Sequence, residues 1–142
     1  MSASPHPLAA SVAAAPGSPA GDEPATHTGP VRRFKDPHYA EVEPTLGELR
    51  GRIDALDAQI VALLAERAQC VRDATRFKRD AFQVAAPARQ AQVFARVRTL
   101  AQAHEHRFPG LPDVVEATYR TLVARFVACE GQFFEDTEPL KP

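Results

Sequence analysis

The apolar residues between positions 45 and 86 follow the period of an α-helix. Thr45 and Glu48 have the spacing of a capping box, which marks a helix start. After this start the apolar positions are spaced mostly four and three residues apart, at Leu49, Ile53, Leu56, Ile60, Leu63, Cys70, Ala74 and Phe77. Such spacing is a heptad seam, and its one gap falls at Arg67. We therefore predict a helix from Leu46 to about Asp80, roughly 50 Å long.

Two further helices follow. The first is predicted from Pro87 to about His106, with its stripe at Gln90, Phe94, Val97, Ala101 and His104. The second is predicted from Pro112-Asp113 to about Glu135, with its stripe at Tyr119, Val123, Phe126, Glu130 and Phe133. Residues 107–111 form a break between them. No segment alternates convincingly with a period of two, so we predict an all-α fold without a sheet.

The long helix carries more apolar surface than its neighbours can cover. It would be roughly 50 Å long, whereas the two shorter helices would each be about 30 Å long. Part of its seam would then face water in a single chain. A second copy of the same chain is the simplest cover, so the pattern predicts an intertwined homodimer.

The prolines divide the chain into segments. Eight of the 13 lie within residues 1–44, and none lies within 45–86. We predict a disordered Ala/Pro-rich tail over residues 1–43, a helical domain over 44–137 and a short C-terminal tail over 138–142. The weakly apolar stretch near Leu8 has no Lys or Arg before it, so a cytoplasmic protein is favoured over an exported one.

Composition excludes several classes of function. A net charge of −1 argues against a protein that binds nucleic acid mainly through phosphate contacts. No run of 18 apolar residues exists, so we expect no membrane span. Cys70 and Cys129 do not have metal-ligand spacing; we expect buried thiols and no metal site.

Three polar residues interrupt the apolar stripes, one in each predicted helix. They are Arg67, Gln90 and Glu130. A charge at such a position costs stability unless it is paired. Arg67 alone could fix the register of a coiled coil or extend to its edge. Together, however, the three residues predict a polar cavity enclosed by three helices.

Further cations lie near the same positions. Arg50, Lys78 and Arg89 join Arg67, so four cations stand against one or two acids. Each of them alone could be a solvated surface residue. As a set they favour a small dianionic ligand, because arginine pairs with carboxylates through two hydrogen bonds.

The motifs that contain these charged residues resemble those of the all-helical chorismate mutase family. The matching motifs are Arg50-x3-Asp54-x2-Asp57, Leu63-Leu64-Ala65-Glu66-Arg67, Phe77-Lys78 and Pro87-Ala88-Arg89. The resemblance covers roughly residues 45–135, and Arg76-Phe77-Lys78 with Ala86-Pro87-Ala88-Arg89 is similar to the isochorismate-pyruvate lyase subgroup. It implies the three-helix type II fold and an intertwined homodimer with two active sites.

The resemblance also implies a role for each cation. Arg67, Lys78 and Arg89 would come from one subunit, and Arg50 would reach in from the other. The arginines would bind the two carboxylates of chorismate, and Lys78 would donate to the ether oxygen of the bond that breaks. The rearrangement to prephenate, a step in aromatic amino acid biosynthesis, is pericyclic. It therefore needs orientation and electrostatic stabilisation but no cofactor.

Two positions depart from the family pattern. Many mutases have an acid at position 90, directed at the substrate hydroxyl, and a glutamine at position 130, near the ether oxygen. Here Gln90 and Glu130 look exchanged. Some mutases do carry a glutamate at that second position, where it must be protonated to donate. We therefore expect Lys78, Glu130 and Gln90 to be the catalytic residues of a mutase.

Two alternatives stay open. Ala86 stands where many mutases have an aspartate, and with Gln90 this resembles the lyase branch, which splits isochorismate into salicylate and pyruvate. The other alternative is a non-catalytic helical dimer that binds a partner helix or an aromatic acid. That interpretation leaves Arg67 and Arg89 without a specific role.

Overall fold

The structure is a computed structural model that describes residues 23–142. Its helical elements are α1 (Leu46–Ala74), a 3₁₀ turn (Thr75–Phe77), α2 (Ala81–Ala85), α3 (Pro87–Gln102) and α4 (Leu111–Glu135). Residues 23–142 contain no strand, so the prediction of an all-α fold is confirmed. The chain divides into two compact units, Met1–Ala58 and Gln59–Pro142, with the boundary inside α1.

The first unit consists of an irregular segment and the start of α1. The predicted capping box is confirmed: the Thr45 hydroxyl accepts from the Glu48 N–H at 3.2 Å and donates to the Glu48 carboxylate at 2.9 Å. The Thr26 carbonyl accepts a further hydrogen bond from the Gly47 N–H at 3.0 Å. A Cβ at Gly47 would lie 3.1 Å from that oxygen, so a side chain there would push the Thr26 carbonyl away by a few tenths of an ångström.

The predicted tail lies only partly within the described residues. Residues 1–22 are outside them, and residues 23–43 form neither helix nor strand. Besides the bond from Gly47, two exposed ion pairs join this segment to α1, Glu23 with Arg50 and Glu43 with Arg52. The disorder of residues 1–43 therefore stays a prediction.

The prediction that the first helix continues to Asp80 is wrong. The α-helix ends at Ala74, a 3₁₀ turn follows, and Lys78 has an extended backbone. Asp80 instead caps the short α2, where its carboxylate accepts from the Gln83 N–H at 2.9 Å. The Gln83 side chain in turn accepts from the Arg79 N–H at 2.7 Å. Because this local cap satisfies the backbone at the start of α2, it competes with continuation of α1.

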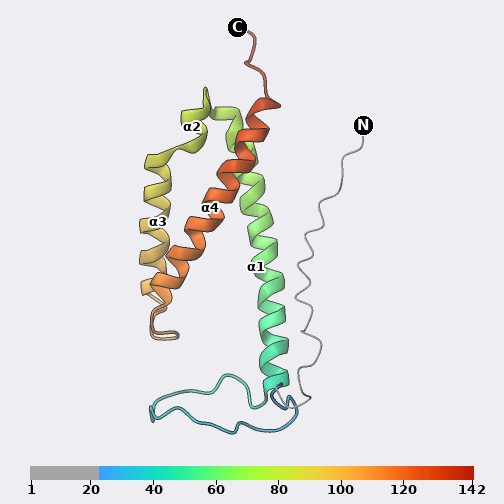
Figure 1. Ribbon diagram of the computed structural model, residues 1–142, viewed down its shortest axis with the longest axis vertical. Coiled ribbons are helices and arrows are strands. Elements are labelled where there is room, and N and C mark those ends of the chain that lie inside the picture. The colour runs from blue at the N-terminus through green and yellow to red at the C-terminus, as the bar shows by residue number, and fades with distance from the viewer. Residues whose placement is uncertain (1–22) are drawn as a thin grey trace. The chain divides into compact units, whose positions relative to one another are not determined.

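The second unit has its core between α3 and α4. The two helices pack side by side, and α2 and the 3₁₀ turn also pack on α4 (Figure 1). The buried apolar residues are Val84, Val97, Ala101 and Val123. The last three occupy stripe positions predicted from the sequence. Helix α3 ends at Gln102 rather than His106, because hydrogen bonds of the tighter i to i+3 type take over after Ala101.

The apolar face of α1 is left uncovered. No residue of α1 is buried. In the first unit Ile53 and Leu56 are 53% and 48% exposed, and in the second unit Ile60 and Leu63 are 52% and 62% exposed. Such a face in one chain is what the predicted dimer would cover; the dimer itself stays a prediction.

The expectation of buried thiols is wrong. Cys70 and Cys129 are both exposed. Cys70 lies on the uncovered helix α1, and Cys129 precedes Glu130, which takes the buried stripe position on α4. Among the helices of residues 23–142, none combines the length and apolar character that a bilayer crossing requires.

The capping box at the start of α1 leads to a stability prediction. Thr45→Ala removes the acceptor for the Glu48 N–H and should lower the free energy of unfolding by about 1 kcal/mol. Urea denaturation measures the change. Thr118→Ala is the matched control, because its exposed hydroxyl bonds only to the Val114 carbonyl within α4. Equal effects of the two substitutions would contradict a capping role for Thr45.

Candidate active site

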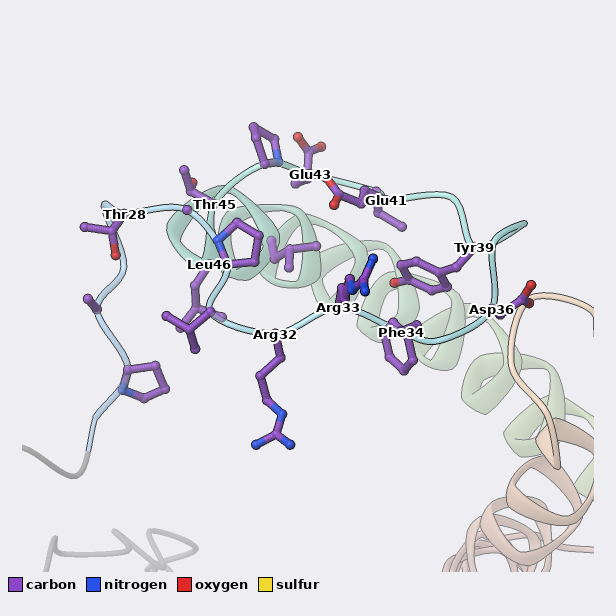
Figure 2. A pocket seen from close by; sticks show the side chains of 18 residues that line it. Thr28, Arg32, Arg33, Phe34, Asp36, Tyr39, Glu41, Glu43, Thr45 and Leu46 are labelled. Carbon is purple, nitrogen blue, oxygen red and sulfur yellow. The ribbon is translucent and has the colours of Figure 1, made fainter.

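One cavity belongs to the first unit and contains none of the predicted site residues. It measures about 670 Å³ and is lined by residues 24–49 of the irregular segment and the start of α1. Figure 2 shows the Phe34 and Tyr39 rings facing each other at its edge, with their centroids 4.3 Å apart. Its lining residues are exposed or half-buried. It therefore offers no buried charged group for chemistry.

A second cavity, of about 350 Å³, lies within the second unit. Five predicted site residues line it: Arg67 from α1, Lys78 after the 3₁₀ turn, Arg89 and Gln90 from the first turns of α3, and Glu130 from α4. The rest of the lining is mainly apolar and includes Val71, Val84, Val93, Val123, Phe126 and Val127. The structure thus brings together side chains that lie up to 63 positions apart in the sequence, Arg67 and Glu130.

Two aromatic rings of α4 hold the Arg67 guanidinium. Its central carbon lies 5.8 Å from the centroid of the Tyr119 ring and 5.4 Å from that of Phe126. A cation over an aromatic face is stabilised without losing its charge. The sequence placed both rings in the stripe of the third predicted helix but did not indicate this contact, because it depends on how α1 and α4 pack.

The cations of this cavity lack acidic partners. Among residues 23–142, no ion pair involves Arg67, Lys78 or Arg89, whereas Arg76 pairs with Asp73 and Arg98 pairs with Asp113. Arg67 and Lys78 are half-buried and Arg89 is exposed. Like charges around one cavity repel each other. A bound anion would relieve that repulsion.

Glu130 is the one carboxyl in the lining of this cavity, and it is 5% exposed. Its Oε1 has no hydrogen-bond partner in the structure. Burial raises the pKa of the Glu130 carboxyl, and the charge of Lys78 partly opposes this increase. The neutral acid is therefore favoured at higher pH than for an exposed glutamate. In that form the carboxyl can donate a hydrogen bond.

The junction between α2 and α3 determines the position of Gln90. Its side-chain amide donates to the Ala85 carbonyl, and its backbone N–H donates to the Ala86 carbonyl at 3.0 Å. Ala86 has a left-handed backbone with φ 43°. Nothing in the sequence pattern indicates this conformation, because alanine rarely adopts it.

Arg50 belongs to the first unit. Its guanidinium is exposed and pairs with Glu23 at 3.2 Å. It is not among the residues that line the second cavity. Its predicted role as a substrate ligand from another subunit stays a prediction.

The second cavity has the size and lining of a small-molecule site, with apolar walls and a few convergent polar groups. Three cations suit a ligand with more than one negative charge, and a neutral acid can add one donor. These side chains can bind and orient such a ligand and stabilise its charge. Separately, residues 23–142 contain no cluster of His, Cys, Asp and Glu that could hold a metal ion.

Comparison with known families agrees with this interpretation. Residues 49–131 match the family described as Chorismate mutase type II. The matched region contains α3 and most of α1 and α4, together with all five predicted residues of the second cavity and Arg50. No curated protein gives a match to the sequence.

Proposed function

Because this chain belongs to the chorismate mutase type II family, we propose that it rearranges chorismate to prephenate in the second cavity. The observation that carries the proposal is the convergence of Arg67, Lys78 and Arg89, without acidic partners, around the buried Glu130. Chorismate is a small dianion, so its two negative charges would offset the positive charges of these side chains.

Binding of the substrate in its reactive conformation would provide much of the rate acceleration. Arg67 and Arg89 would each hold a carboxylate of the substrate and so favour the compact conformer in which the reacting carbons meet. The Tyr119 and Phe126 rings would keep the Arg67 guanidinium in place. Since the reaction is pericyclic, no nucleophile and no cofactor take part.

Two groups would stabilise the transition state. Negative charge develops on the ether oxygen as its bond to carbon breaks. Lys78 would donate to that oxygen with a full positive charge, and the protonated Glu130 would donate a second hydrogen bond. Burial of Glu130 among apolar side chains would strengthen its hydrogen bond, because the local dielectric is low there.

The proposed enzyme is a homodimer. The exposed apolar face of α1 would be covered by the second chain, which would also bring Arg50 to the substrate. Arg50 would then exchange its exposed ion pair with Glu23 for a carboxylate of chorismate. This step is inexpensive, because exposed ion pairs contribute only about 0–1 kcal/mol.

Isochorismate-pyruvate lyase activity is the second candidate. The observation in its favour is that positions 86 and 90, where many mutases have acids, hold Ala86 and Gln90 in the wall of the cavity. The buried Glu130 favours the mutase, because a protonated glutamate at that position has precedent among mutases. Purified protein supplied separately with chorismate and isochorismate distinguishes the two by its products, prephenate or salicylate with pyruvate.

The role of Arg67 separates an enzyme from a non-catalytic helical dimer. Arg67→Ala should lower kcat/KM for chorismate by about a hundredfold or more, because two charge-assisted hydrogen bonds are lost. Arg72→Ala is the control: Arg72 lies on the same helix over the Phe133 ring and outside this cavity. Absence of turnover in the wild type, with unchanged or increased stability of Arg67→Ala, would instead support the non-catalytic dimer.

Glu130 predicts a pH dependence. Because burial raises the pKa of this carboxyl, the donor proton is kept to higher pH than on an exposed glutamate, and activity should fall as the pH rises through that raised pKa. Glu130→Gln keeps a donor at every pH and should remove this fall. The other titratable or charged side chains that face the cavity are Arg67, Cys70, Lys78 and Arg89, and all are present in both proteins. Identical pH–rate profiles for the two would eliminate Glu130 as the donor.

The proposed contribution of Arg50 across subunits can be tested by mixing. Arg50→Ala and Arg67→Ala should each be nearly inactive alone. Random co-expression would give half mixed dimers, each with one intact site out of two, so roughly a quarter of wild-type activity should return. The activity of the co-expressed protein measures this. If the mixture stays as inactive as its parents, Arg50 does not act across subunits.

A further inference from the structure

Arg50 already binds a carboxylate of its own chain. Its Nη2 donates to Oε2 of Glu23 over 3.2 Å, and both side chains are exposed. Each N–H of Nη2 belongs to one of the two faces on which a guanidinium can bind a carboxylate through two parallel hydrogen bonds. Glu23 therefore occupies one of these faces with the same chemical group that the substrate would present.

A backbone contact on the same face of α1 keeps Glu23 close to Arg50. The Thr26 carbonyl accepts from the Gly47 N–H at 3.0 Å. Gly47 and Arg50 are three positions apart on α1, so they are neighbours on the helix surface. Glu23 is likewise three positions before Thr26. The contact at Gly47 therefore raises the effective concentration of the Glu23 carboxylate at Arg50.

The other end of the same segment returns to the start of α1. Figure 2 shows the chain from Thr28 to Thr45 running as a loop beside the first turns of this helix. Near its end, Glu43 forms an ion pair with Arg52 at 3.0 Å. The Glu23 pair can therefore open while the Glu43 end stays attached, so that Arg50 is released by a local change.

We propose that Glu23 is a positioning residue that holds Arg50 in the substrate-free protein and sets the affinity for substrate, whose carboxylate must displace it. The proposal rests on the proposed function and deepens it. A state that cannot bind lowers the apparent affinity in proportion to its population, so substrate binds more weakly when Arg50 is paired more often. By linkage, a substrate that takes Arg50 also loosens residues 23–26 from α1.

The first experiment replaces Glu23 with glutamine, which keeps the size of the side chain and removes its charge. KM for chorismate should fall about two- to fivefold, as expected for the loss of one exposed ion pair. The kcat should not change, because Arg50 contacts substrate in both enzyme–substrate complexes. Glu43→Gln is the matched control: it removes the same charge from the same segment but breaks the pair with Arg52. An unchanged or higher KM in Glu23→Gln, or an equal fall in Glu43→Gln, overturns the proposal.

Ionic strength separates loss of an ion pair from loss of packing. Glu23 and Arg50 are both exposed, so dissolved salt screens their attraction. Salt also screens the substrate, but it does so in both proteins. The ratio of KM in the wild type to KM in Glu23→Gln should therefore approach one between about 0.05 and 0.5 M NaCl. A ratio that does not change with salt overturns the proposal.

Gly47→Ala tests the backbone contact without changing a charge. The added Cβ would lie 3.1 Å from the Thr26 carbonyl oxygen and push it away, so KM should fall as it does in Glu23→Gln. Gly51→Ala is the control, because a Cβ one turn further along α1 meets nothing within 4 Å. In a Glu23→Gln background, Gly47→Ala should have no further effect on KM, since both act through one ion pair. Equal KM values for the two alanine variants, or an effect that persists in that background, contradict the role of this contact.

A readout without turnover separates this proposal from the proposed function. Malonate, a small dicarboxylate, is added to the substrate-free protein while NMR follows the side-chain Nε–H signal of Arg50. The signal should respond at about two- to fivefold lower malonate concentration in Glu23→Gln than in the wild type. In the wild type the backbone signals of residues 23–26 should respond together with Arg50. Equal midpoints in the two proteins overturn the proposal.

The two proposals fail in different ways. If the wild type turns over neither chorismate nor isochorismate, the proposed function is contradicted, and the malonate midpoints decide whether Glu23 competes for Arg50. If the wild type converts chorismate to prephenate but Glu23→Gln has the same KM and the same malonate midpoint, the proposed function stands and the role of Glu23 is wrong.

Discussion

The gathering of three cations around one small cavity is the constraint on which the site depends. Arg67, Lys78 and Arg89 come from different segments, and none of them forms an ion pair within residues 23–142. The Tyr119 and Phe126 rings contact the Arg67 guanidinium but do not neutralise its charge. Glu130, the carboxyl in this lining, is buried, so desolvation favours its neutral form. The cavity is thus suited to a ligand that brings two negative charges of its own.

The same residues connect the proposed chemistry to the fold. Glu130 takes a buried stripe position on α4, and Arg67 takes a seam position on α1. Apolar side chains at these two positions would enlarge the hydrophobic core. They would also remove the Arg67 cation and the Glu130 hydrogen-bond donor from the proposed site. The small set of buried apolar residues, four valine and alanine side chains, is consistent with helices that need further cover. A second chain on the exposed face of α1 would supply that cover and Arg50 together.

The predicted seam continued through Phe77 and so predicted one helix to Asp80. The period alone could not show that a capping pair, Asp80 with Gln83, would start a new helix. The break has a consequence for the site, because Lys78 then lies after α1 and has an extended backbone. Similarly, Gln90 and Arg89 were predicted at the start of a helix after Pro87. The left-handed backbone of Ala86 at this start could not be predicted. It occurs where the Ala86 N–H bonds to α2 and the Ala86 carbonyl bonds to α3.

The sequence alone determined the helical class, the starts of the three long helices and the set of five residues that meet in the cavity. It could do so because helical periodicity and capping are local properties, and because polar residues stand out in apolar stripes. The tertiary structure decided which neighbours those residues have. The rings beside Arg67 and the burial that raises the pKa of Glu130 arise where separate segments pack. The bond from the Gln90 amide to the Ala85 carbonyl forms at the junction of α2 and α3. Such contacts depend on distances between segments, which no local pattern contains.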